Sequence, residues 1–167
     1  MLDGSFSITE AKNRRYDMVL DTIIEDLKRD EGLRLKPYRC PAGKRTIGIG
    51  RNFDDNPITP AELEHILAKS EITENDAEML LRNDLEKTLH KLRTLFREFD
   101  SFPDNVQRVL VNMHFNLGHA GFLSLRTLIK GVNEKNWKHC AERMRTFAWR
   151  KQVGKRAERL IALMQEA

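Results

Sequence analysis

The spacing of hydrophobic positions predicts a mainly helical chain with one short interruption. Between residues 16 and 30 apolar side chains recur every three or four positions, which is typical of one buried helix face that ends near Gly32. The same spacing is sustained from Thr73 to Phe96, long enough for a helix that connects two lobes. Further helices are predicted at about 59–69, 106–117, 121–130, 134–147 and 155–166.

Residues 38–50 have a different pattern. Tyr38, Thr46 and Ile47 favour strands, and the glycines and the proline between them favour turns. This segment predicts a small antiparallel sheet between the first helix and the helical remainder. The fold class is therefore α+β and mainly α, with any reactive site expected between sheet and helices.

Composition limits the classes of partner. The chain has 167 residues, enough for one compact domain or two small lobes, and a formal charge of +4 with a pI of about 9.2. This bias favours an anionic partner, such as nucleic acid, an acidic membrane surface or a charged cell-wall polymer. The first 27 residues lack an uninterrupted apolar core, so we expect neither a signal peptide nor stable membrane insertion.

The sequence gives no indication of a metal or another cofactor. The five histidines have no HExxH or comparable ligand spacing, although His114 and His119 are five residues apart near a predicted helix end. Two cysteines, Cys40 and Cys140, are too few for a disulfide framework, and we expect both to be reduced thiols. The glycines of TIGIG lack the third glycine and the helix of a dinucleotide site.

The segment DEGLRLKPYRCPAGKRTIGIG contains the candidate chemistry. Glu31 lies at a predicted helix end, where it could donate a proton to a glycosidic oxygen. Cys40 and Thr46 could orient and activate a water molecule, or Cys40 could attack the sugar directly. Each residue also has an ordinary structural interpretation: a solvated charge, a core thiol and a strand hydroxyl.

The same segment resembles the active-site segment of the T-even phage lysozymes, the endolysin muramidases. In that family a glutamate, an aspartate or in some members a cysteine, and a threonine form a triad with the spacing of Glu31, Cys40 and Thr46. The resemblance continues through ITENDAEMLLRNDLEKTL, VLVNMHFNLG and AWRKQVGKRAERL. It implies a single lysozyme domain over 1–167, with a sheet-containing lobe at 32–72 and a helical lobe formed by 1–31 and 73–167.

The resemblance also implies secondary site residues. Gly50, Phe115 and Asn116 are expected to line the sugar cleft, and Arg156, grouped with them, is expected to brace Glu31 by an ion pair. An ion pair between Arg51 and Asp84 is a further hypothesis, because the family has a histidine and an aspartate there. Two solvated charges are the alternative. Trp137, Phe147 and Trp149 are interpreted as core residues.

The implied function is hydrolysis of the bond between N-acetylmuramic acid and N-acetylglucosamine by a monomer without a cofactor. The enzyme would remain in the bacterial cytoplasm until a holin opens the membrane and would then reach periplasmic peptidoglycan; delivery in a phage particle is the other route. A lytic transglycosylase is an alternative. An inactive wall-binding or nucleic-acid-binding protein is another, since residues 143–159 are rich in arginine and lysine.

Overall fold

The computed structural model describes residues 8–40, 43–66 and 71–167, and it is mainly helical with one small sheet, as predicted. Helix α1 (Ile8–Glu31) leads into strands β1 (Arg34–Arg39), β2 (Arg45–Gly48) and β3 (Arg51–Asn52). Helices α2 (Pro60–Ile66) and α3 (Glu74–Leu95) follow. The 3₁₀ turn η1 (Phe99–Ser101) precedes five C-terminal helices: α4 (Asp104–Leu123), α5 (Arg126–Asn133), α6 (Trp137–Thr146), α7 (Ala148–Val153) and α8 (Lys155–Gln165).

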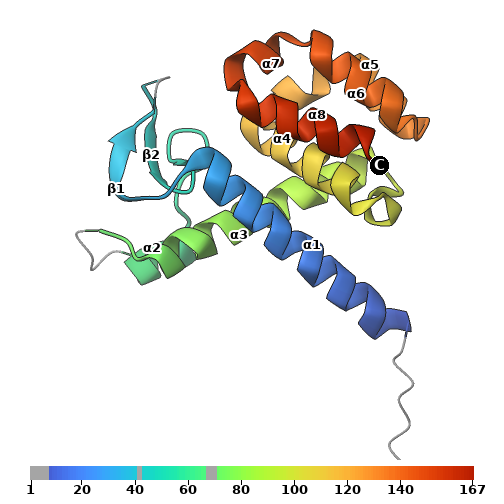
Figure 1. The fold of residues 1–167 in the computed structure, drawn as a ribbon. Coiled ribbons are helices and arrows are strands. Elements are labelled where there is room, and N and C mark those ends of the chain that lie inside the picture. The colour runs from blue at the N-terminus through green and yellow to red at the C-terminus, as the bar shows by residue number, and fades with distance from the viewer. Residues whose placement is uncertain (1–7, 41–42, 67–70) are drawn as a thin grey trace, which may run out of the picture.

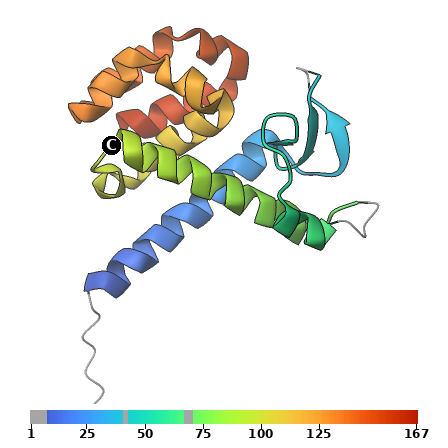
Figure 2. The same ribbon diagram turned by 180° about the vertical axis from the view of Figure 1, so that it is seen from behind.

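The sheet and α2 lie at one end of the molecule and helices α4–α8 at the other, with α3 running between them (Figure 1). Seen from behind, α1 crosses α3 and reaches the sheet at its C-terminal end (Figure 2). The strands are antiparallel in the order β1-β2-β3, with Tyr38 opposite Thr46 and Ile47 opposite Arg51. Because β1 begins three residues after α1 ends, the end of α1 lies beside the sheet.

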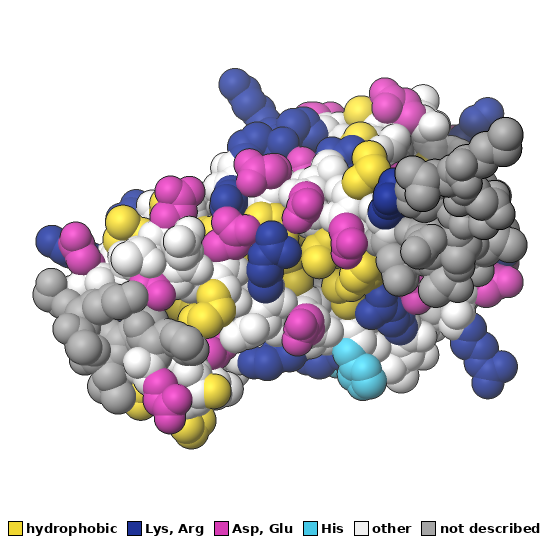
Figure 3. All heavy atoms as spheres, turned by 90° about the horizontal axis from the view of Figure 1, so that it is seen from below, with side chains coloured by type: hydrophobic (Ala, Val, Ile, Leu, Met, Phe, Trp, Pro, Cys, Tyr) yellow, Lys and Arg dark blue, Asp and Glu magenta, His cyan; other side chains and the backbone are white. Residues whose placement is uncertain are grey.

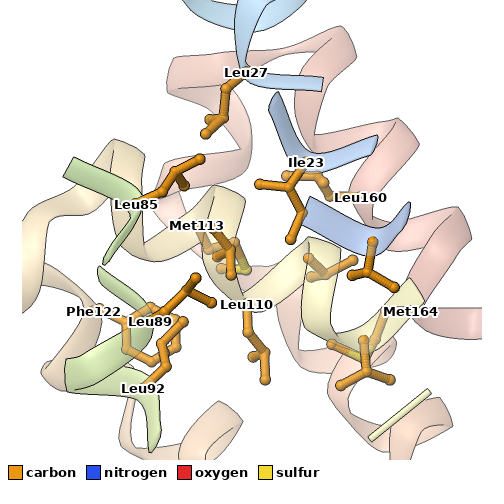
Figure 4. Packing of buried hydrophobic residues seen from close by; sticks show 14 of the residues in the cluster. Ile23, Leu27, Leu85, Leu89, Leu92, Leu110, Met113, Phe122, Leu160 and Met164 are labelled. Carbon is orange, nitrogen blue, oxygen red and sulfur yellow. The ribbon is translucent and has the colours of Figure 1, made fainter. Parts of the chain in front are cut away.

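The hydrophobic core lies where α1, α3, α4 and α8 meet. Figure 4 shows Ile23 and Leu27 from α1 pointing toward Leu85 and Leu89 from α3, with Leu110 and Met113 from α4 and Leu160 from α8 in the same cluster. Leu27, Leu110 and Met113 are completely buried. The helices predicted from the three-four spacing therefore share one core.

Local signals explain several helix ends. Thr73 caps α3 in a capping box, accepting from the Asp76 N–H while the Asp76 carboxylate accepts from the Thr73 N–H. Gly32 follows α1 with a φ of 74° and its N–H donates to the Lys28 carbonyl at 3.0 Å. These caps fix the start of α3 and the position of Glu31 at the end of α1.

The structure differs from the predicted boundaries in places. The sheet begins at Arg34 and includes Asn52, since pairing with β2 recruits residues without strand propensity. Gly118 does not end α4; with a φ of 69° it kinks a helix that continues to Leu123. The segment predicted as one helix over 134–147 is α6, and α7 follows it unpredicted. The predicted end of α2 near Lys69 lies outside the described residues.

The surface carries charges of both signs. Seen from below, Lys and Arg side chains are interspersed with Asp and Glu side chains, and apolar side chains are scattered among them (Figure 3). No described helix combines the length and the apolar character that crossing a membrane requires.

Candidate active site

Glu31, Cys40 and Thr46 line one cleft. It has a volume of about 620 Å³, and its walls come from the end of α1, the sheet and the following loop, α3, and α4 around Gly118. Gly50, Phe115 and Asn116 line it as well. Glu31 and Asn116, which are 85 positions apart in the sequence, thus face the same space. Their chemical roles stay predictions.

Glu31 is the last residue of α1, and its side chain is 21% exposed. Arg156 on α8 donates from Nη1 to Glu31 Oε1 at 2.7 Å. Because one oxygen is held by an arginine and the other is free of that contact, the carboxylate has a fixed orientation at the cleft wall. This contact is the ion pair between Arg156 and Glu31 that the resemblance to the muramidases implies.

Arg156 itself lies behind Glu31 and is not part of the cleft lining. Its Nε donates to Asn112 Oδ1 at 2.7 Å and lies 3.5 Å from Asp30 Oδ2. Asn112 donates in turn to Asp30 Oδ2 at 3.0 Å, and the Asp30 side chain is 1% exposed. The guanidinium is thus held by buried polar groups, and its position is that of a support for Glu31 rather than a substrate contact.

Gly50 packs directly against Glu31. A Cβ atom at Gly50 would lie 3.3 Å from both Cγ and Oε2 of Glu31, and the backbone has a φ of 73°. Both the close approach and the left-handed conformation favour glycine. The residue expected to line the sugar cleft therefore also determines how close the sheet comes to the carboxylate.

The hairpin between β1 and β2 positions Cys40 and Thr46. The Cys40 N–H donates to the Lys44 carbonyl at 2.9 Å, and Thr46 Oγ1 donates to the same carbonyl at 3.1 Å. Thr46 is 3% exposed, whereas Cys40 is half-buried. Because its hydrogen is engaged by Lys44, the Thr46 hydroxyl presents a lone pair, so it can accept a hydrogen bond from a water molecule in the cleft.

The opposite wall comes from α4 just before its kink. Phe115 is half-buried and packs against the core, and Asn116 Oδ1 accepts a hydrogen bond from Trp149 Nε1 at 2.9 Å. This bond leaves the Asn116 amide NH₂ available to the cleft. Trp149 is buried, and Trp137 and Phe147 pack against the same core, which confirms their interpretation as core residues.

Arg51 and Asp84 form the expected ion pair, and it is buried. Arg51 is 1% exposed and donates to Asp84 Oδ1, to Glu62 Oε2 at 2.9 Å and to the carbonyl of Pro57 at 3.1 Å. Burial raises the pKa of Asp84 against the opposing charge of Arg51. Burial also opposes ionisation of Glu62, but hydrogen bonds from Asn83 and the Thr59 N–H, with the Arg51 charge, lower its pKa to about 2.

Several residues of the cleft were not anticipated as site residues. Lys87, Thr88 and Lys91 line it from α3, and His114 and His119 line it from α4. A polar stripe on the predicted helix over 73–96 could have indicated these α3 residues, because its members recur at helical spacing: Asp84, Lys87, Thr88 and Lys91. His114 Nε2 lies 3.1 Å from His119 Nδ1. No group of three or more His, Cys, Asp or Glu side chains in the described part of the chain is placed to hold a metal.

Most of the C-terminal basic cluster has partners within the protein. Arg150 pairs with Glu158 at 2.7 Å, Arg145 donates to Gln165 at 2.7 Å, and Arg159 pairs with Asp30. These contacts give Arg145, Arg150 and Arg159 structural roles. They weaken the nucleic-acid-binding alternative, which needs such charges to be available.

A family model described as "Phage lysozyme" matches residues 28–165. The chain belongs to the phage lysozyme family. Among its relatives, "Probable T4-type lysozyme 1" of Dictyostelium discoideum is 28% identical, with 88% of this chain and 95% of the relative covered. "Endolysin" of Salmonella phage P22 is 29% identical, with 83% and 86% covered. "Pre-baseplate central spike protein Gp5" of Enterobacteria phage T4 is 26% identical, but the match spans 27% of that protein.

Proposed function

We propose that this protein is a muramidase that hydrolyses the bond between N-acetylmuramic acid and N-acetylglucosamine in peptidoglycan. The observation that carries the proposal is the arrangement of the cleft. The braced carboxylate of Glu31 lies on it together with Cys40 and Thr46 on the hairpin. Membership in the phage lysozyme family supports the substrate class.

In this mechanism Glu31 is the general acid. It protonates the oxygen of the scissile bond, so that the bond to the sugar carbon breaks as an alcohol leaves. Arg156 holds Oε1, which leaves Oε2 for the proton and for contact with substrate. Gly50 keeps the sheet close to that oxygen without a side chain in the way.

Cys40 and Thr46 serve the incoming water. Thr46 Oγ1, with its own hydrogen donated to the Lys44 carbonyl, accepts a hydrogen bond from the water. Cys40, acting as the thiolate, takes up the proton of the water on Sγ as attack proceeds and becomes the thiol. The anomeric carbon then receives the water oxygen on the face opposite the departing sugar, which inverts its configuration. Direct attack by Cys40 would give retention instead, so the product anomer distinguishes the two routes.

The test is loss of turbidity of chloroform-treated Gram-negative cells under reducing conditions, with mass analysis of the released fragments. Wild type should lyse the cells and release reducing muramic acid ends, and Glu31→Gln should abolish both. Cys40→Asp should retain activity, while Cys40→Ser should lose most of it. Anhydro-muramic ends would show a lytic transglycosylase. Binding without cleavage by folded wild type would refute the proposal in favour of a wall-binding protein.

The biological setting belongs to the same proposal. A monomer accumulating in the bacterial cytoplasm would reach periplasmic peptidoglycan after a holin opens the inner membrane. The similarity to a phage spike protein keeps delivery in a virion as the competing route. Expression in a Gram-negative bacterium should leave the cells intact until a pore-forming holin is co-expressed, whereas spontaneous lysis would contradict holin dependence.

A further inference from the structure

The cleft continues beyond the catalytic residues to a segment formed by two helices. We call it the α3–α4 end and define it by Lys87, Thr88 and Lys91 on α3 and His114 and His119 on α4. Thr88 and His114 are 7% and 4% exposed, so they form the floor, and the two lysines and His119 are exposed at the rim. The proposed cleavage chemistry uses none of these five residues.

Charges in the cleft are not balanced evenly. Its three carboxylates each have a cationic partner within 3 Å, whereas Lys87 donates to the Asn56 side chain at 2.9 Å and lies 4.0 Å from the already paired Asp84. The carboxylate pairs are Glu31 with Arg156, Asp55 with Lys44 and Asp84 with Arg51. Lys91 makes no hydrogen bond or ion pair with any described residue. Arg51 is shared by Asp84 and Glu62, so Lys87 completes the charge balance of that group, and Lys91 carries the charge at the α3–α4 end that no described carboxylate neutralises.

The histidine pair supplies an N–H donor at the same place. His114 Nδ1 is buried and has no hydrogen-bond partner among the described residues, so its proton is better placed on Nε2, which can donate to His119 Nδ1. That bond leaves His119 as the Nε2–H tautomer, with an exposed N–H on the cleft. Burial, together with His119 and Lys91, lowers the pKa of His114 to about 4, which keeps it neutral at neutral pH.

We propose that the α3–α4 end binds carboxylates of the peptide stems of peptidoglycan, with Lys87 and Lys91 supplying charge and His119 an N–H donor. The proposal rests on the proposed muramidase function. The N-acetylated sugars of the glycan strand are uncharged, and the stems carry free carboxylates. Lys91, which lines the cleft and has no acidic partner among the described residues, therefore complements the peptide part of the substrate, and Lys87 adds charge beside it.

The experiment compares three forms of soluble, uncrosslinked glycan strands. One carries native stems, one has all stem carboxylates converted to methylamides with carbodiimide and methylamine, and one has been stripped of stems by an amidase, which leaves only the lactyl carboxylate. The variants are Lys91→Glu and, as a matched control, Lys138→Glu, an exposed lysine on α6 outside the cleft. Reducing-end release gives kcat and KM separately.

Lys91→Glu should lower kcat/KM on native stems by about five- to tenfold, chiefly through KM, because it removes one attraction and adds one repulsion. It should change kcat/KM less than twofold on methylamide stems, and Lys138→Glu should behave as wild type on all strands. His119→Leu should lower kcat/KM on native stems by about threefold and leave methylamide stems unaffected.

Three results would overturn the proposal. Equal losses for Lys91→Glu on native and methylamide stems, or no loss on either, would exclude recognition of stem carboxylates. A loss that persists on amidase-stripped strands would assign the lysine to the lactyl carboxylate instead. Failure of the muramidase function is a separate outcome, since wild type would then release no reducing ends from any of the three strands.

Discussion

Glu62 should be one of the strongest electrostatic contributors to stability in this protein. Its carboxylate is 3% exposed and accepts from Arg51, from the Thr59 N–H at 2.7 Å and from Asn83 at 2.9 Å. Through these bonds it ties α2 to the sheet and to α3. Glu62→Gln removes the charge while keeping the size of the side chain, so it isolates the electrostatic part of this contact.

The magnitude follows from the pKa. The folded state lowers the pKa of Glu62 from 4.5 to about 2, and each pKa unit corresponds to about 1.4 kcal/mol, so ionised Glu62 stabilises the fold by ~3 kcal/mol. A lowered folded pKa means that this stability is present above the unfolded pKa. It is lost as the pH falls through the folded value, so the window runs from 4.5 down to about 2.

Urea unfolding of wild type and Glu62→Gln from about pH 7 to about pH 2 measures this directly. The difference in unfolding free energy between wild type and Glu62→Gln should narrow by ~3 kcal/mol as the pH falls through the window. Any difference that persists at low pH comes from the amide NH₂ of the introduced glutamine, which faces Arg51. Asp84→Asn is the contrasting variant: because burial raises the pKa of Asp84, loss of its charge should cost less near neutral pH. A pH-independent difference for Glu62→Gln, or equal costs for both variants, would refute the reasoning.

Three other changes test the site. Gly50→Ala should lower kcat at least tenfold and destabilise the folded protein by about 1–2 kcal/mol. Gly154→Ala is the control, since Gly154 also has a positive φ but has open space where its Cβ would lie; it should destabilise the folded protein without loss of kcat. Unfolding and lysis assays measure the two effects. Iodoacetamide should label Cys40 and not Cys140 in the native state, because burial raises the pKa of the Cys140 thiol to about 11; peptide mass mapping gives the answer, and equal labelling contradicts it. Arg156→Lys should lower kcat about tenfold with KM little changed, since a lysine cannot span the partners of the planar guanidinium; unchanged kcat would show that bracing is dispensable.

The fold could largely be predicted because its determinants are local. The three-four spacing of apolar residues identified α1 and α3, and the Thr73 and Asp76 capping box marked where α3 begins. Boundaries were missed where tertiary contacts override local preference. Pairing with β2 draws Arg34 into a strand, and the Gly118 kink lets α4 continue because Phe122, beyond it, is buried in the core.

The residues of the candidate site also fall into those that local sequence predicts and those that depend on tertiary packing. Glu31, Cys40 and Thr46 lie within a segment of sixteen residues, so their meeting required only a helix end followed by a hairpin. Lys91 and His119 come from different helices, and their meeting depends on how α3 packs on α4. Local sequence does not encode that packing. The tautomer of His119 depends further on the burial of His114, which only the assembled core determines.

The end of α1 shows how one local feature separates stability from chemistry. Asp30 and Glu31 are adjacent, but a helix turns by about 100° per residue, so consecutive side chains point in different directions. The Asp30 side chain is 1% exposed among Asn112, Arg156 and Arg159, whereas that of Glu31 is 21% exposed on the cleft. Arg156 contacts both, so the buried carboxylate fixes the arginine that orients the exposed one. Substitutions of Asp30 should therefore reduce activity without any contact with substrate, through the same guanidinium that Arg156→Lys would perturb.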